Sequence, residues 1–351
     1  MKPKAALVIG ARPQFIKAAP LILEMGRFFN VVLIHTGQHY DFMMSDNFFS
    51  ELNLPLPDFH LNCNGRSAGK VIGQMISDLE SVYEFEKPDL VVVIGDTNST
   101  LAGSLAAAHG SLPICHVEAG VRSKNQKLPE QINRVVTDSI SDYFLCPTSS
   151  SVNNLKNEGK TDNIHDTGDI IYDCLRLMEK RIPDRPSIQI DIPDNFVLVT
   201  IHRAEAVDNK NNLENILHSL GTSPIPVIFP AHPRTAKMID NFHLKNELPQ
   251  NVILTEPIGY LDLLSLIRLS DIVITDSGGV QREAVFLNKI ALIPRPETEW
   301  VEFEQMNCLK VVGYEFDVAE FESIKSKAGE DLTQLLRPSA KNMAEILTSL
   351  F

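Results

Sequence analysis

The feature that most constrains the fold is an alternation of short, β-rich apolar runs with longer stretches of helical spacing. In the first half of the chain, the apolar runs predict buried strands at 4–9, 31–35, 90–94, 113–116 and 143–146. Helical spacing predicts helices between them, at 17–25, 69–86, 100–109 and 131–141. Such alternation is typical of a parallel sheet whose crossover helices cover both faces.

The same alternation starts again after a polar, proline-rich stretch at 181–193. Here the predicted strands are 196–200, 227–230, 252–254, 272–275 and 290–293, and the predicted helices are 212–220, 260–269 and 280–287. A chain of 351 residues is long for a single core. We therefore predict an α/β protein of two Rossmann-like doubly wound domains, 1–172 and 173–332, facing a central cleft that would bind the ligand.

Composition narrows the classes of partner. The content of 44% hydrophobic and 22% charged residues is that of a soluble globular protein. A formal net charge of −13 argues against general binding to nucleic acid or to anionic membranes. No apolar run approaches the ~20 residues that span a bilayer, and the first residues lack a signal-peptide pattern, so we expect a cytoplasmic protein. The five scattered cysteines are expected as free thiols rather than disulfides or zinc ligands.

Three acidic residues stand where a sheet of this kind presents its chemistry. Asp96 follows the predicted strand 90–94, and Glu118 follows 113–116. Asp96 alone could cap a helix, but two acids at neighbouring strand ends favour proton transfer. Glutamate is also rare at the end of a buried strand unless it has a partner or a task. Glu130 precedes Arg134 by four residues, so a helix-surface ion pair is the alternative for that pair.

The turns after the first two strands are less specific. Gly10-Ala-Arg12-Pro13 enters a helix that contains Lys17, and backbone amides in such a turn can approach an anion. The alternative is a simple turn with solvated basic residues. Neither a Gly-x-Gly-x-x-Gly nor a Walker A pattern is present, so dinucleotide and ATP sites are unsupported. The turn that contains His39 is equally well explained as a surface turn, and Arg122 as an ordinary ion-pair partner.

In the second domain, histidine and arginine recur after two strands. His202 and Arg203 follow 196–200, and His232 and Arg234 follow 227–230. Each pair alone would be an ordinary loop. Together with the turn that opens the helix after 272–275, they predict a site for a diphosphate and a ribose. That turn and its helix contribute Ser277, Gly278, Gly279 and Glu283.

These motifs occur together, in one order, in a known family. The motifs are Gly10-Ala-Arg-Pro, Thr36-Gly-Gln-His, Gly95-Asp-Thr-Asn-Ser-Thr, His116-Val-Glu-Ala-Gly-Val-Arg-Ser, Pro129-Glu-Gln-Ile-Asn-Arg and Asp276-Ser-Gly-Gly-Val-Gln-Arg-Glu. Over residues 5–313 the chain resembles the non-hydrolysing UDP-N-acetylglucosamine 2-epimerases of bacteria and archaea. The resemblance implies a glycosyltransferase-B-like fold in which a C-terminal helix, 333–351, returns to the first domain.

The resemblance also implies the reaction. UDP-N-acetylglucosamine and UDP-N-acetylmannosamine, a precursor of surface polysaccharides, would interconvert through 2-acetamidoglucal, without a metal or other cofactor. The enzyme would be a homodimer, as members of the family often are. Residues that match the catalytic set are Asp96, Glu118, Glu130 and His202. The substrate-binding residues that we expect are Arg12, Lys17, His39, Arg134, Arg203, His232, Arg234, Ser277, Gly278, Gly279, Glu283 and Arg295.

Two departures from the family pattern leave the exact substrate open. Many members carry Arg-Asp-Thr-Thr-Glu-Arg where this chain has Arg295-Pro-Glu-Thr-Glu299-Trp300, so a tryptophan replaces an arginine. Gln131 stands where glutamate is common. These changes allow a modified sugar, such as a UDP-2,3-diacetamido glucuronate. The sequence also allows a hydrolysing 2-epimerase that releases N-acetylmannosamine and UDP, a glycosyltransferase of the same fold, and a non-catalytic UDP-sugar-binding protein.

Overall fold

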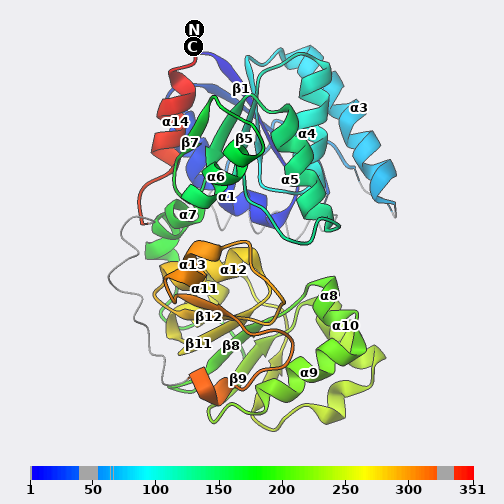
Figure 1. Ribbon diagram of the computed structural model, residues 1–351, viewed down its shortest axis with the longest axis vertical. Helices are drawn as coiled ribbons and strands as arrows, with labels where there is room; N and C mark the ends of the chain where they lie inside the picture. The colour runs from blue at the N-terminus through cyan, green and yellow to red at the C-terminus, as the bar shows by residue number, and fades with distance from the viewer. Residues whose placement is uncertain (1, 39–53, 64, 66, 322–335) are drawn as a thin grey trace. The chain divides into compact units, whose positions relative to one another are not determined.

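The computed structural model describes residues 2–38, 54–63, 65, 67–321 and 336–351. The chain divides into two compact units (Figure 1). Unit 1 consists of Met1–Leu177 and Arg337–Phe351, and unit 2 is Met178–Leu336. In the described parts of the chain, no helix combines the length and the apolar character that crossing a bilayer requires.

Unit 1 is built on a parallel sheet of seven strands in the order β3-β2-β1-β4-β5-β6-β7. The chain reverses its direction of winding between β1 and β4, which makes this a doubly wound sheet. The strands are β1 (Lys4–Ile9), β2 (Asn30–His35), β3 (Phe59–His60), β4 (Leu90–Ile94), β5 (Ile114–Val117), β6 (Tyr143–Cys146) and β7 (Ile164–Asp166). Ile94 and Val117, the last residues of β4 and β5, lie opposite each other. The segments that follow these two strands therefore begin side by side at the carboxyl end of the sheet.

Helices cover both faces of this sheet (Figure 1). The helices are α1 (Arg12–Met25), α3 (Ala68–Glu86), α4 (Asn98–His109), α5 (Pro129–Ile140), α6 (Ser149–Asn157), α7 (Ile170–Met178) and α14 (Ala340–Thr348). Buried side chains of α3 and α4 pack on one face against alternate residues of β1 and β4, such as Ala6 and Val91. The C-terminal helix α14 packs against α1, and Asp173 fixes its start by accepting from the backbone N–H of Ser339 at 2.7 Å.

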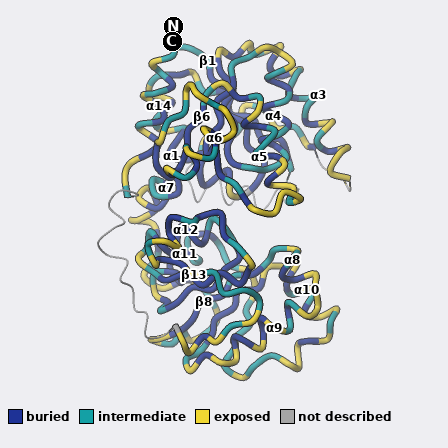
Figure 2. Tube along the Cα trace, viewed as in Figure 1, coloured by how far each residue is buried: buried dark blue, intermediate teal, exposed yellow. Residues whose placement is uncertain are grey.

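Unit 2 contains a second doubly wound parallel sheet, of six strands in the order β10-β9-β8-β11-β12-β13. The strands are β8 (Val197–Thr200), β9 (Val227–Pro230), β10 (Val252–Thr255), β11 (Ile272–Thr275), β12 (Ile290–Ile293) and β13 (Leu309–Val311). The helices are α8 (Ala204–Val207), α9 (Lys210–Leu220), α10 (Pro233–Asn241), α11 (Tyr260–Leu269), α12 (Gly278–Phe286) and α13 (Val301–Gln305), with 3₁₀ turns η1 (Glu179–Arg181), η2 (Leu244–Glu247) and η3 (Val318–Phe321). In each unit the central strands are buried, whereas the edge strands β3, β7 and β10 are only partly buried (Figure 2).

The α/β class and the two doubly wound sheets confirm the prediction, and most predicted elements are within two residues of their observed bounds. Two predictions were wrong in detail. Helix α1 begins at Arg12 rather than at residue 17, because Pro13 suits the first turn of a helix. In the described part of 333–351, helix extends only over Ala340–Thr348. All five cysteines are buried free thiols, as predicted.

Candidate active site

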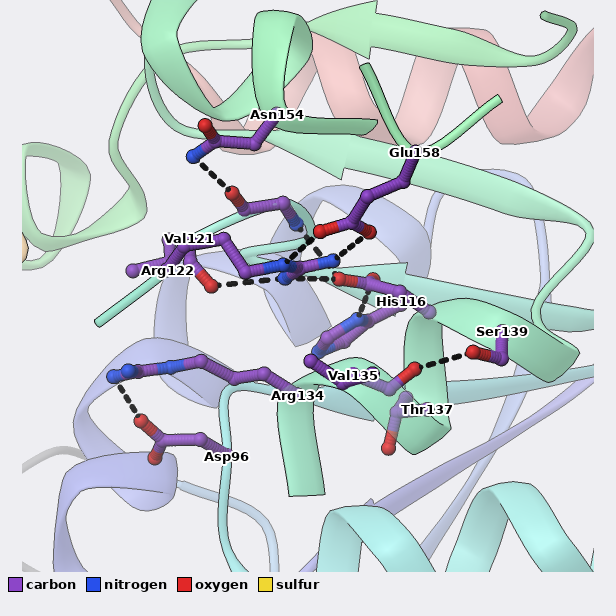
Figure 3. A network of polar contacts seen from close by, with 12 residues as sticks. Asp96, His116, Val121, Arg122, Arg134, Val135, Thr137, Ser139, Asn154 and Glu158 are labelled. Atoms are coloured by element: carbon purple, nitrogen blue, oxygen red, sulfur yellow. Dashed lines mark hydrogen bonds and ion pairs between the residues drawn. The ribbon is translucent and has the colours of Figure 1, made fainter. Parts of the chain in front are cut away.

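The two strand-end acids of unit 1 each contact one cation. Glu118 follows β5 and is buried, and its Oε2 forms an ion pair with the Nζ of Lys17 on α1. Asp96 follows β4, and its Oδ2 pairs with the Nη2 of Arg134 on α5 (Figure 3). The Lys17 and Arg134 side chains are themselves nearly buried. The alternatives of a solvated Lys17 and of a surface pair between Arg134 and Glu130 are therefore wrong.

The backbone around the two acids adopts an unusual conformation. Gly95 and Glu118 have φ angles of +68° and +67°. That left-handed region costs a residue with a side chain roughly 1–2 kcal/mol, and such outliers cluster at functional sites. A Cβ on Gly95 would lie 3.1 Å from the Glu118 Oε2 and 3.3 Å from the Lys17 Nζ. The Glu118 carboxylate thus packs on the backbone of the residue that precedes Asp96.

The turn after β1 has a different task from the one predicted. The backbone N–H groups of Gly10 and Ala11 both donate to the Gln14 Oε1, at 2.8 and 3.1 Å. Gln14 in turn donates to the carbonyl of Ile94, at 2.9 Å, and so ties the start of α1 to the end of β4. These two amides are committed to the fold, so the prediction that this turn offers them to an anion is wrong. The motifs of the sequence gave no indication of this role for Gln14.

Three predicted residues of unit 1 are not brought into this cluster by any described contact. Glu130 lies exposed in the first turn of α5, one turn before Arg134. His39 lies outside the described residues. Arg12 is the first residue of α1, and its side chain is likewise outside the described part. A residue that the sequence analysis missed is Asn133, whose Nδ2 donates to the backbone carbonyl of Asp96 at 2.9 Å.

In unit 2 the strand-end acid is Asp276, which sequence reasoning treated only as part of a turn. It is fully buried and accepts from the backbone N–H groups of His202 and Arg203 at 2.9 and 2.7 Å. The Nδ1 of His202 lies 3.3 Å from the other Asp276 oxygen, while 39% of the His202 side chain is exposed. The Asp276 carboxylate thus lies beside the ring and accepts from the backbone at its base. The ring of His232 lies beside it, with centroids 5.3 Å apart.

Helix α12 begins at Gly278, next to these residues. Ser277 is its N-cap, and a Cβ on Gly278 would lie 3.3 Å from the Trp300 Nε1 and 3.9 Å from the Arg203 Nη2. The Arg203 guanidinium therefore lies near the positive end of the helix, where both favour an anion. The Arg282 guanidinium stacks on the Trp300 ring in a cation–π contact, 4.0 Å from the ring centroid. The tryptophan that departs from the family pattern is thus part of the wall of this region.

Three predicted ligands of unit 2 are engaged with protein partners. Glu283 is buried and accepts from the Tyr260 hydroxyl at 2.9 Å, a contact that the sequence analysis missed. Arg295 is buried and donates twice to Glu299, at 3.1 and 3.2 Å. Burial alone would lower the pKa of Arg295, but Glu299 raises it above its ordinary value. Arg234 forms an ion pair with the exposed Asp208. The hydrogen bond from Arg234 lowers the pKa of the Asp208 carboxyl.

The comparisons with known proteins agree with this geometry. The model of one protein family, described as UDP-N-acetylglucosamine 2-epimerase, matches residues 23–338. A UDP-N-acetylglucosamine 2-epimerase homolog of Methanococcus maripaludis is 46% identical over 308 residues, 85% of this chain and 85% of that protein. The UDP-2,3-diacetamido-2,3-dideoxy-D-glucuronate 2-epimerase of Pseudomonas aeruginosa is 41% identical over 338 residues, 94% of this chain and 93% of that protein.

Among solved structures, one similar protein is the Methanocaldococcus jannaschii UDP-GlcNAc 2-epimerase, crystallised in complex with UDP-GlcNAc and UDP. It is 35% identical to this chain, with a TM-score of 0.82, and the match covers 99% of this chain and 100% of that one.

Proposed function

Because the chain belongs to the UDP-N-acetylglucosamine 2-epimerase family and is an epimerase, we propose that it interconverts UDP-N-acetylglucosamine and UDP-N-acetylmannosamine. The observation that carries the proposal is the pair of carboxylates, Asp96 and Glu118, at adjacent strand ends. A carboxylate on each side of C2 can remove a proton from one face and return a proton to the other. The proposed product is a precursor of surface polysaccharides.

The chemistry needs both a base and a leaving-group site. The proton on C2 is not acidic, so its removal must be coupled to cleavage of the C1–O bond. UDP then departs with the bonding electrons, and 2-acetamidoglucal remains bound. Protonation of C2 from the opposite face and re-addition of UDP at C1 give the epimer. Asp96, Glu118 and Glu130 are the proposed acids and bases of these steps.

The residues of unit 2 are proposed to bind the UDP group. A hydrogen-bond donor that is already oriented stabilises developing negative charge without reorganisation. His202 fits this role, because its Nδ1 lies 3.3 Å from the Asp276 carboxylate and its ring is partly exposed. Arg203, Ser277 and Gly278 are proposed to contact the diphosphate, and Glu283 the ribose. Arg295, in this scheme, positions Glu299 near Arg203, whose Nη1 lies 3.7 Å from the Glu299 Oε1.

A second candidate substrate is a UDP-sugar modified at C3 and C6. The similarity to the Pseudomonas aeruginosa diacetamido-glucuronate epimerase over 94% of this chain favours it. Both substrates react at C2, so the proton transfers and the UDP contacts are the same for each. We expect the enzyme to be a cytoplasmic homodimer that needs no cofactor.

The test is proton NMR of the purified protein with UDP-N-acetylglucosamine in heavy water. The expected result is growth of the UDP-N-acetylmannosamine anomeric signal, with deuterium at C2 of both sugars. Release of UDP and free N-acetylmannosamine would instead identify a hydrolysing 2-epimerase. If UDP-N-acetylglucosamine is unchanged while the UDP-2,3-diacetamido glucuronate is epimerised, the second candidate replaces the first. No exchange with either sugar would contradict the proposed function.

A further inference from the structure

A buried histidine that the proposed chemistry does not use contacts the turn that carries Asp96 and, through Asp138, the turn that carries Glu118. His116 is the third residue of β5 and is fully buried. Its Nδ1 lies 2.6 Å from the Asp138 Oδ1, and its Nε2 lies 2.7 Å from the carbonyl oxygen of Gly95. Figure 3 shows the ring next to the network formed by Arg122 and Glu158. Both ring nitrogens therefore face oxygen atoms.

The partners decide which atoms carry protons. A carbonyl oxygen can only accept, so the His116 Nε2 donates to Gly95. The Asp138 Oδ2 accepts from the backbone N–H of Gly120 at 3.1 Å and from the Arg122 Nη1 at 2.7 Å. Burial alone would raise the pKa of Asp138, but His116 and Arg122 together lower it. Asp138 is thus a carboxylate that can accept from the His116 Nδ1, while the His116 Nε2 faces the Gly95 carbonyl.

This ion pair links the two turns that carry the acids. Through its Nε2, His116 holds the carbonyl of Gly95, the residue immediately before Asp96. Through Asp138, it holds the N–H of Gly120, two residues after Glu118. Gly95 is held from its other side as well, because its N–H donates to the carbonyl of Val117 at 2.9 Å. Both turns have positive φ angles, at Gly95, Glu118 and Gly120, so they depend on such contacts to keep their shape.

The other arm of the network ends at the surface. Arg122 donates to both oxygens of Glu158, at 2.7 and 2.6 Å, and the Glu158 side chain is 43% exposed. The pair of Arg122 and Glu158 agrees with the expectation that Arg122 is an ordinary ion-pair partner. Within the described part of the chain, Glu158 is linked to the two turns through Arg122 and Asp138, so it provides a matched control for the His116 arm.

We propose that His116 is a positioning residue, which holds the Gly95 carbonyl and the Asp138 carboxylate so that Asp96 and Glu118 keep the orientation that proton transfer at C2 requires. This inference rests on the proposed function. His116 itself does not contact the sugar in this scheme. Its effect is on the geometry of the two carboxylates, and misplacement of a catalytic group by ~1 Å costs about 10²-fold in rate.

Two substitutions separate the two contacts of the ring. In His116→Gln, the side-chain amide can reach the place of Nε2 and donate to Gly95. In His116→Asn, the shorter amide takes the place of Nδ1 and donates only to Asp138. We expect His116→Asn to lower kcat by about 10²-fold, with KM for the UDP-sugar and the Kd for UDP little changed. We expect His116→Gln to recover most of that loss, and Glu158→Gln to keep the wild-type kcat.

A readout without turnover accompanies the kinetics. Hydrogen exchange at the amides of 95–97 and 118–120 should be faster in His116→Asn than in wild type, with the unit 2 amides unchanged as the internal control. Equal losses of kcat in the Asn and Gln variants, in proportion to their loss of melting temperature, would overturn the inference.

The two proposals fail in different ways. If wild-type protein leaves C2 of every UDP-sugar unexchanged, the proposed function is wrong, and the exchange of 95–97 and 118–120 in His116→Asn decides the positioning by itself. If wild type is active and His116→Asn keeps its kcat, or leaves those amides as protected as before, the positioning role is wrong and the proposed function stands.

Discussion

The two units share one type of sheet and use its carboxyl edge in opposite ways. In unit 1, the chain leaves β4 and β5 through Asp96 and Glu118, and a cation from a neighbouring helix pairs with each acid. In unit 2, the acid after β11 is fully buried and holds backbone N–H groups, while His202 and Arg203 keep part of their surface exposed. The same doubly wound edge therefore presents acids in one unit and donors in the other.

The comparison teaches that the doubly wound topology determines where polar residues gather, at the carboxyl ends of the strands, but not which charge they present. What differs is where the acid stands relative to the backbone. Positive φ angles at Gly95 and Glu118 shape the two turns of unit 1, and the Glu118 carboxylate packs against the Gly95 backbone. In unit 2, Asp276 accepts from the N–H groups after β8, which turns the acid inward and the histidine outward. Each prediction below changes one side of this contrast.

The largest effect is expected at the acids of unit 1. Asp96→Asn and Glu118→Gln keep the size of each side chain and remove its capacity to transfer a proton. We expect the rate of deuterium entry at C2 to fall by about 10²–10⁴-fold in each variant. Isothermal titration should show that UDP still binds with wild-type affinity, because the UDP contacts are assigned to unit 2. A variant that exchanges C2 at the wild-type rate would remove its residue from the proposed chemistry.

The corresponding change in unit 2 is His202→Asn. Loss of an oriented donor to the departing diphosphate should lower kcat by about 10²–10³-fold. Asp276→Asn is the companion variant, because an asparagine can keep one accepting oxygen for the two N–H groups but loses the charge beside the His202 Nδ1. We expect it to lower kcat by less than His202→Asn does. Steady-state kinetics on both variants tests this, and a larger loss in Asp276→Asn would mean that the acid acts on more than His202.

These contrasts show what could be predicted from the sequence. Alternating apolar runs gave the two sheets, and the motifs gave the family, which the comparisons confirm. The polar partners could not be predicted in the same way. Gln14, His116 and Tyr260 each contact a residue far along the chain, namely Ile94, Gly95 and Glu283, so no local spacing reveals these contacts.

The error at Gly10 has the same physical origin. A glycine turn that enters a helix is the pattern of an anion site, and local sequence contains nothing against it. The structure shows a different reason for the glycine. A Cβ there would lie 2.0 Å from the Thr36 Oγ1 and 2.2 Å from the Ser99 Oγ, so tight packing of three segments excludes a side chain. Such a reason exists only in the folded chain.

A smaller effect, on stability, is expected from Asp138→Asn in the unit 1 network. Asparagine removes the charge and replaces one of the two accepting oxygens that His116 and Arg122 share, and we expect a loss of ~1–3 kcal/mol in the free energy of unfolding. Folding lowers the pKa of Asp138 below its ordinary value of 3.8. Its contribution is therefore present above pH 3.8 and is lost as the pH falls through the lowered pKa. Urea unfolding at about pH 5 and about pH 3 should show the gap between variant and wild type narrowing at the lower pH.

In unit 2, Gly278→Ala tests the anion-binding end of α12. The added methyl group would lie 3.3 Å from the Trp300 Nε1 and close to the Arg203 guanidinium, where a phosphate oxygen is proposed to bind. We expect about a tenfold weaker Kd for UDP, which corresponds to ~1.4 kcal/mol. Gly279→Ala is the matched variant, because it keeps the backbone N–H predicted to face the phosphate, and the atom its Cβ would approach is the Ser277 Oγ, at 3.8 Å. Equal weakening in both variants would point to a disturbed helix start rather than a blocked phosphate.

The smallest effect is expected at the exposed pair of Arg234 and Asp208. Their side chains are 46% and 43% exposed, so solvent screens the attraction, and a double-mutant cycle should give a coupling of about 0.2–1 kcal/mol in stability. The more useful readout is UDP affinity. If Arg234 serves the ligand, as the contrast between the units predicts, Asp208→Asn should release its guanidinium and strengthen UDP binding slightly, whereas Arg234→Ala weakens it. If Arg234→Ala leaves UDP affinity unchanged, the role of Arg234 is to pair with Asp208, as Lys17 and Arg134 pair with acids in unit 1. The contrast between the units would then not extend to this pair.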